Sequence, residues 1–306
     1  MTTPFLLAAA LPAHGPAPDP ARLLVDARAA EDAGLHLVTI EAGPADPLLV
    51  AARLAAQTTR IAVAPVTATT TTEPFHVSTA LATIDVVAAG RAGWVLTVDD
   101  PAEVAGTVTW EPPSDAAGDA AEHLDAVRAL WDSWEEDAVI RDIATARFLD
   151  RTKVHHVDLR GEHLAVRGPS ITPRPPQGAP PVLVRATDAA TLALGRAHGD
   201  ALLVGEGALA ALLADPEVPP VLVELAVDPA EDPARTAERL AALRTARAAG
   251  AVLHAEDPAR ALERLEPALR AAGLARPADA ADDPVPTLRE RLGLGPAVNR
   301  YAEAGR

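Results

Sequence analysis

Short apolar runs without polar alternation recur along the chain, separated by longer segments of mixed character. Continuous apolar strands separated by helices are typical of a parallel sheet that is covered on both faces. Eight such runs occur, at residues 5–11, 36–41, 60–66, 93–98, 181–185, 200–204, 220–227 and 251–254. Eight runs predict a closed (β/α)8 barrel, with an open doubly wound sheet as the alternative.

The helices between these runs carry a repeated boundary signature. An acidic residue, a proline at the first helical position and a glycine beyond the last turn mark the two ends of a helix. The starts are at Asp19-Pro20, Asp46-Pro47, Glu73-Pro74 and Asp257-Pro258, and Gly34, Gly90 and Gly273 follow three of the ends. Strand and helix signals therefore alternate as a barrel requires.

The alternation is interrupted between about residues 99 and 180. An acidic, proline-rich loop over 99–119 precedes a helix expected over 120–135. The segment 154–166 predicts a hairpin in which two short runs flank 158–161, and five prolines make 170–181 an extended loop. We expect one domain spanning 1–306, with 99–180 inserted after the fourth strand on the C-terminal rim of the barrel.

Composition and charge narrow the possible functions. The net charge of −16 disfavours binding to nucleic acid or to anionic membranes. The absence of cysteine excludes disulfides and thiolate chemistry. No window approaches the roughly 18 apolar residues of a membrane helix, and 5–11 lacks the basic flank of a signal peptide, so we expect a cytoplasmic protein. His155 and His156 would point to opposite faces of a strand, so no metal site is expected.

Several segments together resemble a known family. They are 73–97, 127–134, 154–169, 173–178 and 287–294, followed by Asn299-Arg300-Tyr301. The chain resembles the bacterial-luciferase-like flavin-dependent monooxygenases, most closely the branch of nitrilotriacetate and dibenzothiophene-sulfone monooxygenases. The resemblance implies a (β/α)8 barrel, oxygenation of a small organic substrate, and reduced FMN supplied by a separate reductase. It also implies a homodimer formed through helices that flank strands 2 to 4.

The resemblance further implies where a flavin would bind. Glu41 stands where the family has an acidic residue near the isoalloxazine ring, and Thr67 and Thr69 stand at the hydroxyl-rich end of strand 3. His14 follows the first strand and is the candidate catalytic residue. The remaining candidate cofactor-binding residues are Trp94, Val95, Arg185, Ala186, Thr187 and Asp188.

Some of these positions depart from the family pattern. Val95 replaces an asparagine, and a valine side chain cannot form hydrogen bonds. Thr187 and Asp188 replace the part of a Gln-Ala-Gly-x-Ser segment that meets the FMN phosphate, and Asp188 adds a negative charge there. Two interpretations therefore stand beside each other: a flavin-dependent monooxygenase using FMN or a deazaflavin, and a barrel without flavin that acts as a binding module or partner subunit.

Overall fold

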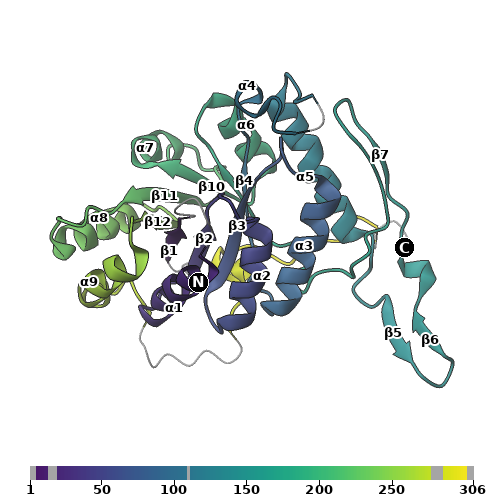
Figure 1. Ribbon diagram of the computed structural model, residues 1–306, viewed down its shortest axis with the longest axis horizontal. Coiled ribbons are helices and arrows are strands. Elements are labelled where there is room, and N and C mark those ends of the chain that lie inside the picture. Colours follow the sequence, from purple (N-terminus) through teal and green to yellow (C-terminus); the bar gives the residue numbers. More distant parts are fainter. Residues whose placement is uncertain (1–4, 13–18, 109–110, 277–284, 302–306) are drawn as a thin grey trace.

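The strands close into a parallel barrel in the computed structural model, which describes residues 5–12, 19–108, 111–276 and 285–301. The strand order around the barrel is β1-β12-β11-β10-β9-β4-β3-β2, and β2 returns to β1 (Figure 1). All eight predicted runs supply a strand, so the (β/α)8 prediction is confirmed and the open sheet is excluded. The strands are β1 (Leu6–Leu11), β2 (Leu37–Ile40), β3 (Ala62–Ala68), β4 (Trp94–Thr97), β9 (Val182–Arg185), β10 (Ala201–Gly205), β11 (Val221–Ala226) and β12 (Gly250–His254).

The helices that cover the barrel begin and end close to their predicted boundaries. Asp19, Asp46 and Asp257 each accept a hydrogen bond from the first turn of the helix that follows, whereas Glu73 makes no such bond. Gly34 and Gly90 both have φ of +82°, which glycine adopts without strain. The principal helices are α1 (Pro20–Asp32), α2 (Pro47–Gln57), α3 (Pro74–Val87), α5 (Ala116–Asp132), α6 (Ala189–His198), α8 (Pro233–Thr245) and α9 (Pro258–Ala271), and the short ones are α4 (Pro101–Val104), α7 (Leu209–Leu212) and α10 (Leu288–Arg291).

Two apolar layers hold the barrel together. Side chains that alternate along the strands fill the interior, where leucine and alanine dominate, and the opposite set packs under the helices. Within the part of the chain that the structure describes, no helix is both long enough and apolar enough to cross a membrane.

The segment between β4 and β9 is built differently from the rest. Its main helix α5 packs between α3 and α6, where a barrel helix normally lies. Two antiparallel hairpins follow, β5 (Val139–Asp142) with β6 (Arg147–Leu149), and β7 (Asp158–Arg160) with β8 (Ala165–Arg167). The second hairpin was predicted with its turn at 158–161. That placement is wrong, because Asp158–Arg160 forms the first strand and the turn follows it.

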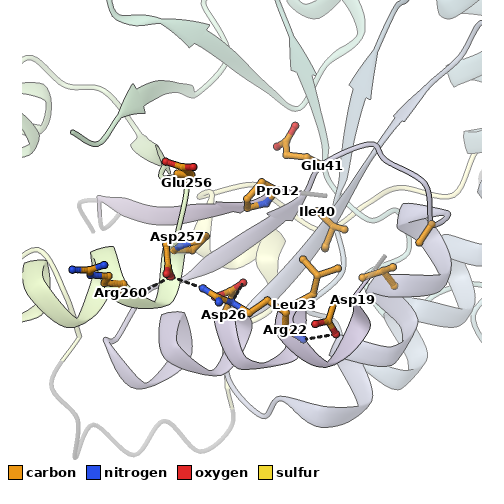
Figure 2. Close-up of a pocket in the computed structure, with 13 residues that line it drawn as sticks. Pro12, Asp19, Arg22, Leu23, Asp26, Ile40, Glu41, Glu256, Asp257 and Arg260 are labelled. Atoms are coloured by element: carbon orange, nitrogen blue, oxygen red, sulfur yellow. Dashed lines mark hydrogen bonds and ion pairs between the residues drawn. The ribbon is translucent and has the colours of Figure 1, made fainter. Parts of the chain in front are cut away.

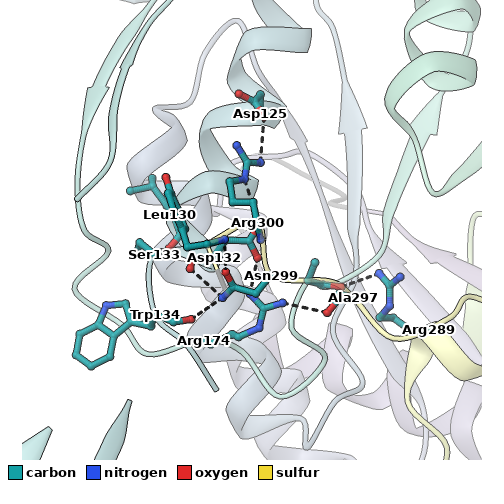
Figure 3. Close-up of polar contacts among 12 residues, drawn as sticks. Asp125, Leu130, Asp132, Ser133, Trp134, Arg174, Arg289, Ala297, Asn299 and Arg300 are labelled. Carbon is teal, nitrogen blue, oxygen red and sulfur yellow. Dashed lines mark hydrogen bonds and ion pairs between the residues drawn. The ribbon is translucent and has the colours of Figure 1, made fainter. Parts of the chain in front are cut away.

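Polar contacts fasten the C-terminal segment to the end of α5 (Figure 3). The buried Asp132 carboxylate accepts hydrogen bonds from the guanidinium groups of Arg174 and Arg300, and Arg300 also donates to Asp125 at 3.0 Å. The Asn299 amide donates to the backbone carbonyls of Asp132 and Trp134. The residues 299–301, which carry part of the family resemblance, therefore serve to hold the fold.

Three further segments of the resemblance meet in a second buried cluster. Asp85 is fully buried, and its carboxylate accepts hydrogen bonds from the backbone N–H of Gln177, the Gln177 side chain and the N–H of Ala92. Gln177 in turn accepts from the backbone N–H of Arg289 at 2.9 Å. Burial raises the pKa of Asp85 to about 6, against the hydrogen bonds that favour its ionised form. These contacts lie before β4 and β9, away from the C-terminal ends of the strands.

Candidate functional site at the C-terminal ends of the strands

Four polar side chains face one another where the barrel strands end. They are Glu41 after β2, Arg185 on β9, Glu224 on β11 and His254 on β12. Parallel strands place their carboxyl ends at the same rim, which is where barrels of this kind carry their sites. The apolar side chains two residues earlier on β9, β11 and β12 lie in the barrel interior. They are Leu183, Leu222 and Val252.

These four side chains are here called the ring. Arg185 joins its two carboxylates. Its Nη1 and Nη2 donate to the two oxygens of Glu41, both at 2.9 Å, and its Nε donates to Glu224 Oε1 at 2.9 Å. Burial alone would lower the pKa of Arg185, but Glu41 and Glu224 outweigh it and hold that pKa above its usual value. The guanidinium thus bridges two carboxylates, and its contact with Glu41 has the two-pronged geometry that favours arginine.

His254 completes the ring beside Glu224. Its Nε2 lies 3.2 Å from Glu224 Oε1 but is not aligned for a hydrogen bond, and this buried nitrogen has no other hydrogen-bond partner. Burial would raise the pKa of Glu224, but His254 and Arg185 outweigh that effect and lower it. Glu224 is therefore held as a carboxylate, which suits a paired charge rather than a proton donor.

Val95 and Trp94 lie on opposite faces of β4. Val95 is fully buried inside the barrel between Val66 and Leu183, so the position where the family has an amide is apolar here. Trp94 points toward the helices instead, and its Nε1 donates to Thr67 Oγ1 at 2.7 Å. The structure therefore separates Trp94 and Thr67 from the ring of charged side chains.

Thr69 and His123 are buried on the helix side of the sheet. Thr69 Oγ1 and His123 Nε2 have no hydrogen-bond partner, and both residues line a cavity of about 250 Å³ near the start of α5. The imidazole of His123 lies 5.9 Å from the Trp94 ring, and burial lowers the pKa of His123 to about 4. The candidate catalytic residue His14 lies outside the described residues.

The backbone N–H groups of the turn after β9 are already hydrogen-bonded within the protein. The N–H of Ala186 donates to the carbonyl of Leu203, and those of Thr187 and Asp188 both donate to Thr191 Oγ1 at 3.1 Å. The Asp188 carboxylate accepts from the N–H of Thr191 at 2.8 Å, which completes a capping box at the start of α6. These hydrogen bonds from Thr191 lower the pKa of Asp188, so it carries its charge at neutral pH.

The residues at this turn do not fit the phosphate of FMN. A helix N-terminus attracts anions through its free N–H groups and its dipole. Here Asp188 occupies the N-cap with its own negative charge, and Thr191 takes up the two preceding N–H groups. The nearby cation, Arg185, is already neutralised by two carboxylates. A phosphate would thus meet a like charge and donors that are already in use.

A cavity of about 600 Å³ opens beside the ring, between the start of α1, the end of β2 and the turn before α9 (Figure 2). Glu41 is shared between the ring and this cavity. Three charged residues that line the cavity are paired with one another, because Arg22 donates to Asp26 at 3.1 Å and also contacts Asp257. The cavity lies at the rim where a barrel takes its ligands.

Glu224 and His254 were not among the candidate residues predicted from the sequence. The signal was present, since each is the polar member of an otherwise apolar strand. A charged side chain in a buried strand needs an oppositely charged partner, and for Glu224 that partner is Arg185.

Comparison with known proteins supports the barrel and extends the likeness along the whole chain. The sequence profile of the family described as luciferase-like monooxygenase matches residues 2–292. One of the subunits of pristinamycin IIA synthase from Streptomyces pristinaespiralis is 32% identical over 312 residues, which cover 99% of each chain. Dibenzothiophene-sulfone monooxygenase from Rhodococcus erythropolis is 40% identical over 155 residues, which make up 50% of this chain and 34% of that protein. The structure of EDTA monooxygenase from a Chelativorans species superposes with a TM-score of 0.78 at 17% identity, covering 95% of this chain and 99% of that one.

Proposed function

This chain belongs to the luciferase-like monooxygenase family, and we propose that it works in the flavin-dependent oxygenation of a small organic substrate as a companion barrel to a flavin-holding subunit. The observation that carries the proposal is the capping box at the start of α6, where Asp188 takes the place of an anion. The relative that matches along its whole length is itself named as one subunit of a synthase. In such an assembly a separate reductase would supply reduced FMN to the partner.

Repulsion between the Asp188 carboxylate and an FMN phosphate would be large enough to change the affinity for FMN. A like-charge pair at about 4 Å costs on the order of 1–4 kcal/mol, depending on the effective dielectric constant. Each 1.4 kcal/mol is about tenfold in affinity. One misplaced carboxylate at Asp188 is therefore enough to weaken FMN binding by about one to three powers of ten.

The ring at the barrel mouth gives a second reason to expect weak flavin binding by this chain. The family resemblance places Glu41 beside the flavin ring, but its carboxylate is held by both terminal nitrogens of Arg185. A ligand at Glu41 would therefore meet a carboxylate whose charge is already balanced by Arg185, which also compensates Glu224. The charged groups at the mouth are thus paired with one another.

The second candidate is that this barrel itself holds reduced FMN or a deazaflavin. It is favoured by the retention of all eight strands and by the family match to residue 292. In that case Glu41 and the turn from Arg185 to Asp188 would line the flavin, as the resemblance implies. The two candidates differ in one measurable quantity, the affinity of the isolated chain for FMN.

The change Asp188→Ser together with Thr187→Gly tests the proposal. Serine keeps the N-cap and glycine frees the turn, so the helix is retained while the negative charge is removed. FMN binding, measured by quenching of flavin fluorescence, should tighten by about tenfold or more. The matched control is Asp46→Ser, which removes an N-cap carboxylate from α2 and should leave flavin binding unchanged.

Two results would count against this account. Micromolar binding of FMN by the unchanged chain would favour the second candidate. No response to the double change would show that the Asp188 charge is not what keeps the phosphate away.

A further inference from the structure

The cavity of about 250 Å³ near the start of α5 is here called the acidic cavity. It lies between the loop that joins β3 to α3, the segment leading into α5, and the turn between β7 and β8. None of the four ring residues lines it. Its volume is below the roughly 300–1,000 Å³ of pockets for drug-sized ligands, so it suits a molecule of a few non-hydrogen atoms. The polar lining residues that bear on its chemistry are Thr69, Glu73, Glu111, Asp119, His123 and His163.

Two buried polar atoms that line the acidic cavity have no hydrogen-bond partner in the protein. Thr69 is 4% exposed and His123 is 1% exposed, and the unpartnered atoms are Thr69 Oγ1 and His123 Nε2. Native proteins pair nearly all such atoms with protein, water or ligand, because an unpaired buried polar group is costly. Two of them in one small cavity therefore indicate a bound molecule that supplies the missing hydrogen bonds.

The walls of the acidic cavity are held in place by hydrogen bonds. The Glu122 carboxylate accepts from the backbone N–H groups of residues 162–164 at 2.7, 2.9 and 3.2 Å, which fastens the turn between β7 and β8 to α5. On the other side, Trp94 lies beside His123 and is itself held by Thr67. The lining groups are thus positioned before any ligand arrives, which favours binding.

The charged groups that line the acidic cavity are carboxylates. Glu73, Glu111 and Asp119 contribute to the lining, and no arginine or lysine is among the described residues that form it. The Glu73 carboxylate does not cap the helix that follows it. Burial raises the pKa of Asp119, which is the response of a carboxylate that lacks a sufficient cation. The cavity therefore favours a positively charged ligand and disfavours a phosphate.

The same groups are suited to accept hydrogen bonds. Carboxylates are acceptors only, and threonine and a neutral imidazole can each accept as well. Burial lowers the pKa of His123 to about 4, so its imidazole is neutral at neutral pH. Among the residues that the structure describes, no group of three or more acidic or histidine side chains is arranged to hold a metal ion. An ammonium group, with three donors and no acceptor, matches this lining better than a metal ion does.

We propose that the acidic cavity binds a small organic cation through a primary ammonium group. Thr69 Oγ1 and His123 Nε2 accept its hydrogen bonds at the buried end, with the imidazole proton on Nδ1, and the lining carboxylates balance its charge. The inference goes beyond the proposed function and does not depend on where the flavin binds.

Calorimetric titration of the purified chain with n-propylammonium at low salt tests the proposal. 1-Propanol and propionate have a similar size but lack the positive charge, so they serve as matched ligands. The limit on binding per non-hydrogen atom puts the dissociation constant of so small a ligand above about 40 μM, and we expect about 0.1–5 mM. The other two should bind at least about tenfold more weakly. Propylammonium should also shift the Nε2 resonance of His123 in ¹⁵N-histidine-labelled protein.

Three variants place the binding in the acidic cavity. His123→Phe and Thr69→Val each remove one unpartnered atom and keep a similar shape, and each should raise the dissociation constant for propylammonium by at least about fivefold. Asp119→Asn should raise it by at least about threefold. The matched control is Thr79→Val, which removes another unpartnered hydroxyl that does not line the cavity and should change the constant by less than about twofold.

Unfolding in urea shows that the variants remain folded. Because Thr69 Oγ1 and His123 Nε2 have no partner in the protein, Thr69→Val and His123→Phe should unfold at the same urea concentration as the unchanged chain or at a higher one.

Three results would overturn the proposal. Equal binding of propylammonium and 1-propanol, or no binding of either, would show that water or a neutral molecule fills the cavity. Binding of propylammonium that His123→Phe and Thr69→Val leave unchanged would place the cation elsewhere. Tighter, competing binding of Mg²⁺ would make the ligand a metal ion. Each of these results would leave the affinity for FMN, and hence the proposed function, unaffected.

Discussion

Replacing Arg185 by methionine tests how firmly the barrel mouth is held by its own charges. Methionine keeps much of the arginine stem's volume but removes the guanidinium that joins Glu41 to Glu224. Both carboxylates then remain close together, largely out of water and without their cation. The free energy of unfolding at neutral pH should fall for this reason.

The magnitude follows from the burial of the three side chains. Removing one partner of a fully buried ion pair costs about 3–5 kcal/mol, and exposed pairs contribute about 0–1 kcal/mol. The side chains of Arg185, Glu41 and Glu224 are 16%, 21% and 22% exposed, which puts this site nearer the buried limit. We therefore expect a loss of about 2–4 kcal/mol.

Urea unfolding followed by circular dichroism and tryptophan fluorescence measures this loss. Arg239→Met is the matched control, because Arg239 also bridges two carboxylates, Glu206 and Glu231, but at the surface. It should cost no more than about 1 kcal/mol.

A rescue variant separates the charge effect from loss of packing. Changing Glu41 and Glu224 to glutamine in the Arg185→Met background removes the two unpaired charges, and stability should return to within about 1 kcal/mol of the unchanged chain. The reasoning is refuted if Arg185→Met costs no more than Arg239→Met, or if the glutamine changes restore nothing.

Two further predictions concern the fold. Gly250→Ala should destabilise by about 3 kcal/mol or more, because a Cβ there would lie 2.2 Å from the backbone oxygen of Leu6, whereas Gly207→Ala meets nothing within 4 Å and should change urea stability by less than about 1 kcal/mol. Burial lowers the pKa of His36 to about 4, so its contribution to stability is present above pH 6.5 and is lost as the pH falls toward 4, by up to about 3 kcal/mol. His36→Asn should flatten the stability–pH profile in that window, and the exposed His76→Asn should not.

The barrel could be predicted because its signals are local. Each buried parallel strand is a continuous apolar run, and an aspartate–proline pair before a helix with glycine after it is visible without knowledge of the fold. The hairpin of β5 and β6 escaped prediction for the opposite reason, since 139–149 is largely exposed and carries no apolar periodicity. The turn of the second hairpin was misplaced because Asp158 and Gly161 resemble turn residues, although Asp158 lies in the strand.

The candidate site was predicted only in part. The structure brings Glu41 to Arg185, but their pairing joins residues 144 positions apart, and no local pattern reveals it. The separation of Trp94 from Val95 follows from strand alternation, which places neighbours on opposite faces. Asp188 has a local explanation as well, because an aspartate three residues before Thr191 is a typical helix cap.

The affinity of the isolated chain for reduced FMN tests the central claim most directly. Anaerobic ultrafiltration of photoreduced FMN with the purified chain, followed by reoxidation and measurement of flavin in the filtrate, gives that affinity without reference to any substrate. The account predicts a dissociation constant above about 100 μM, equivalent to less than about 5.5 kcal/mol of binding free energy. Saturable binding of one FMN per chain at a few micromolar would contradict it.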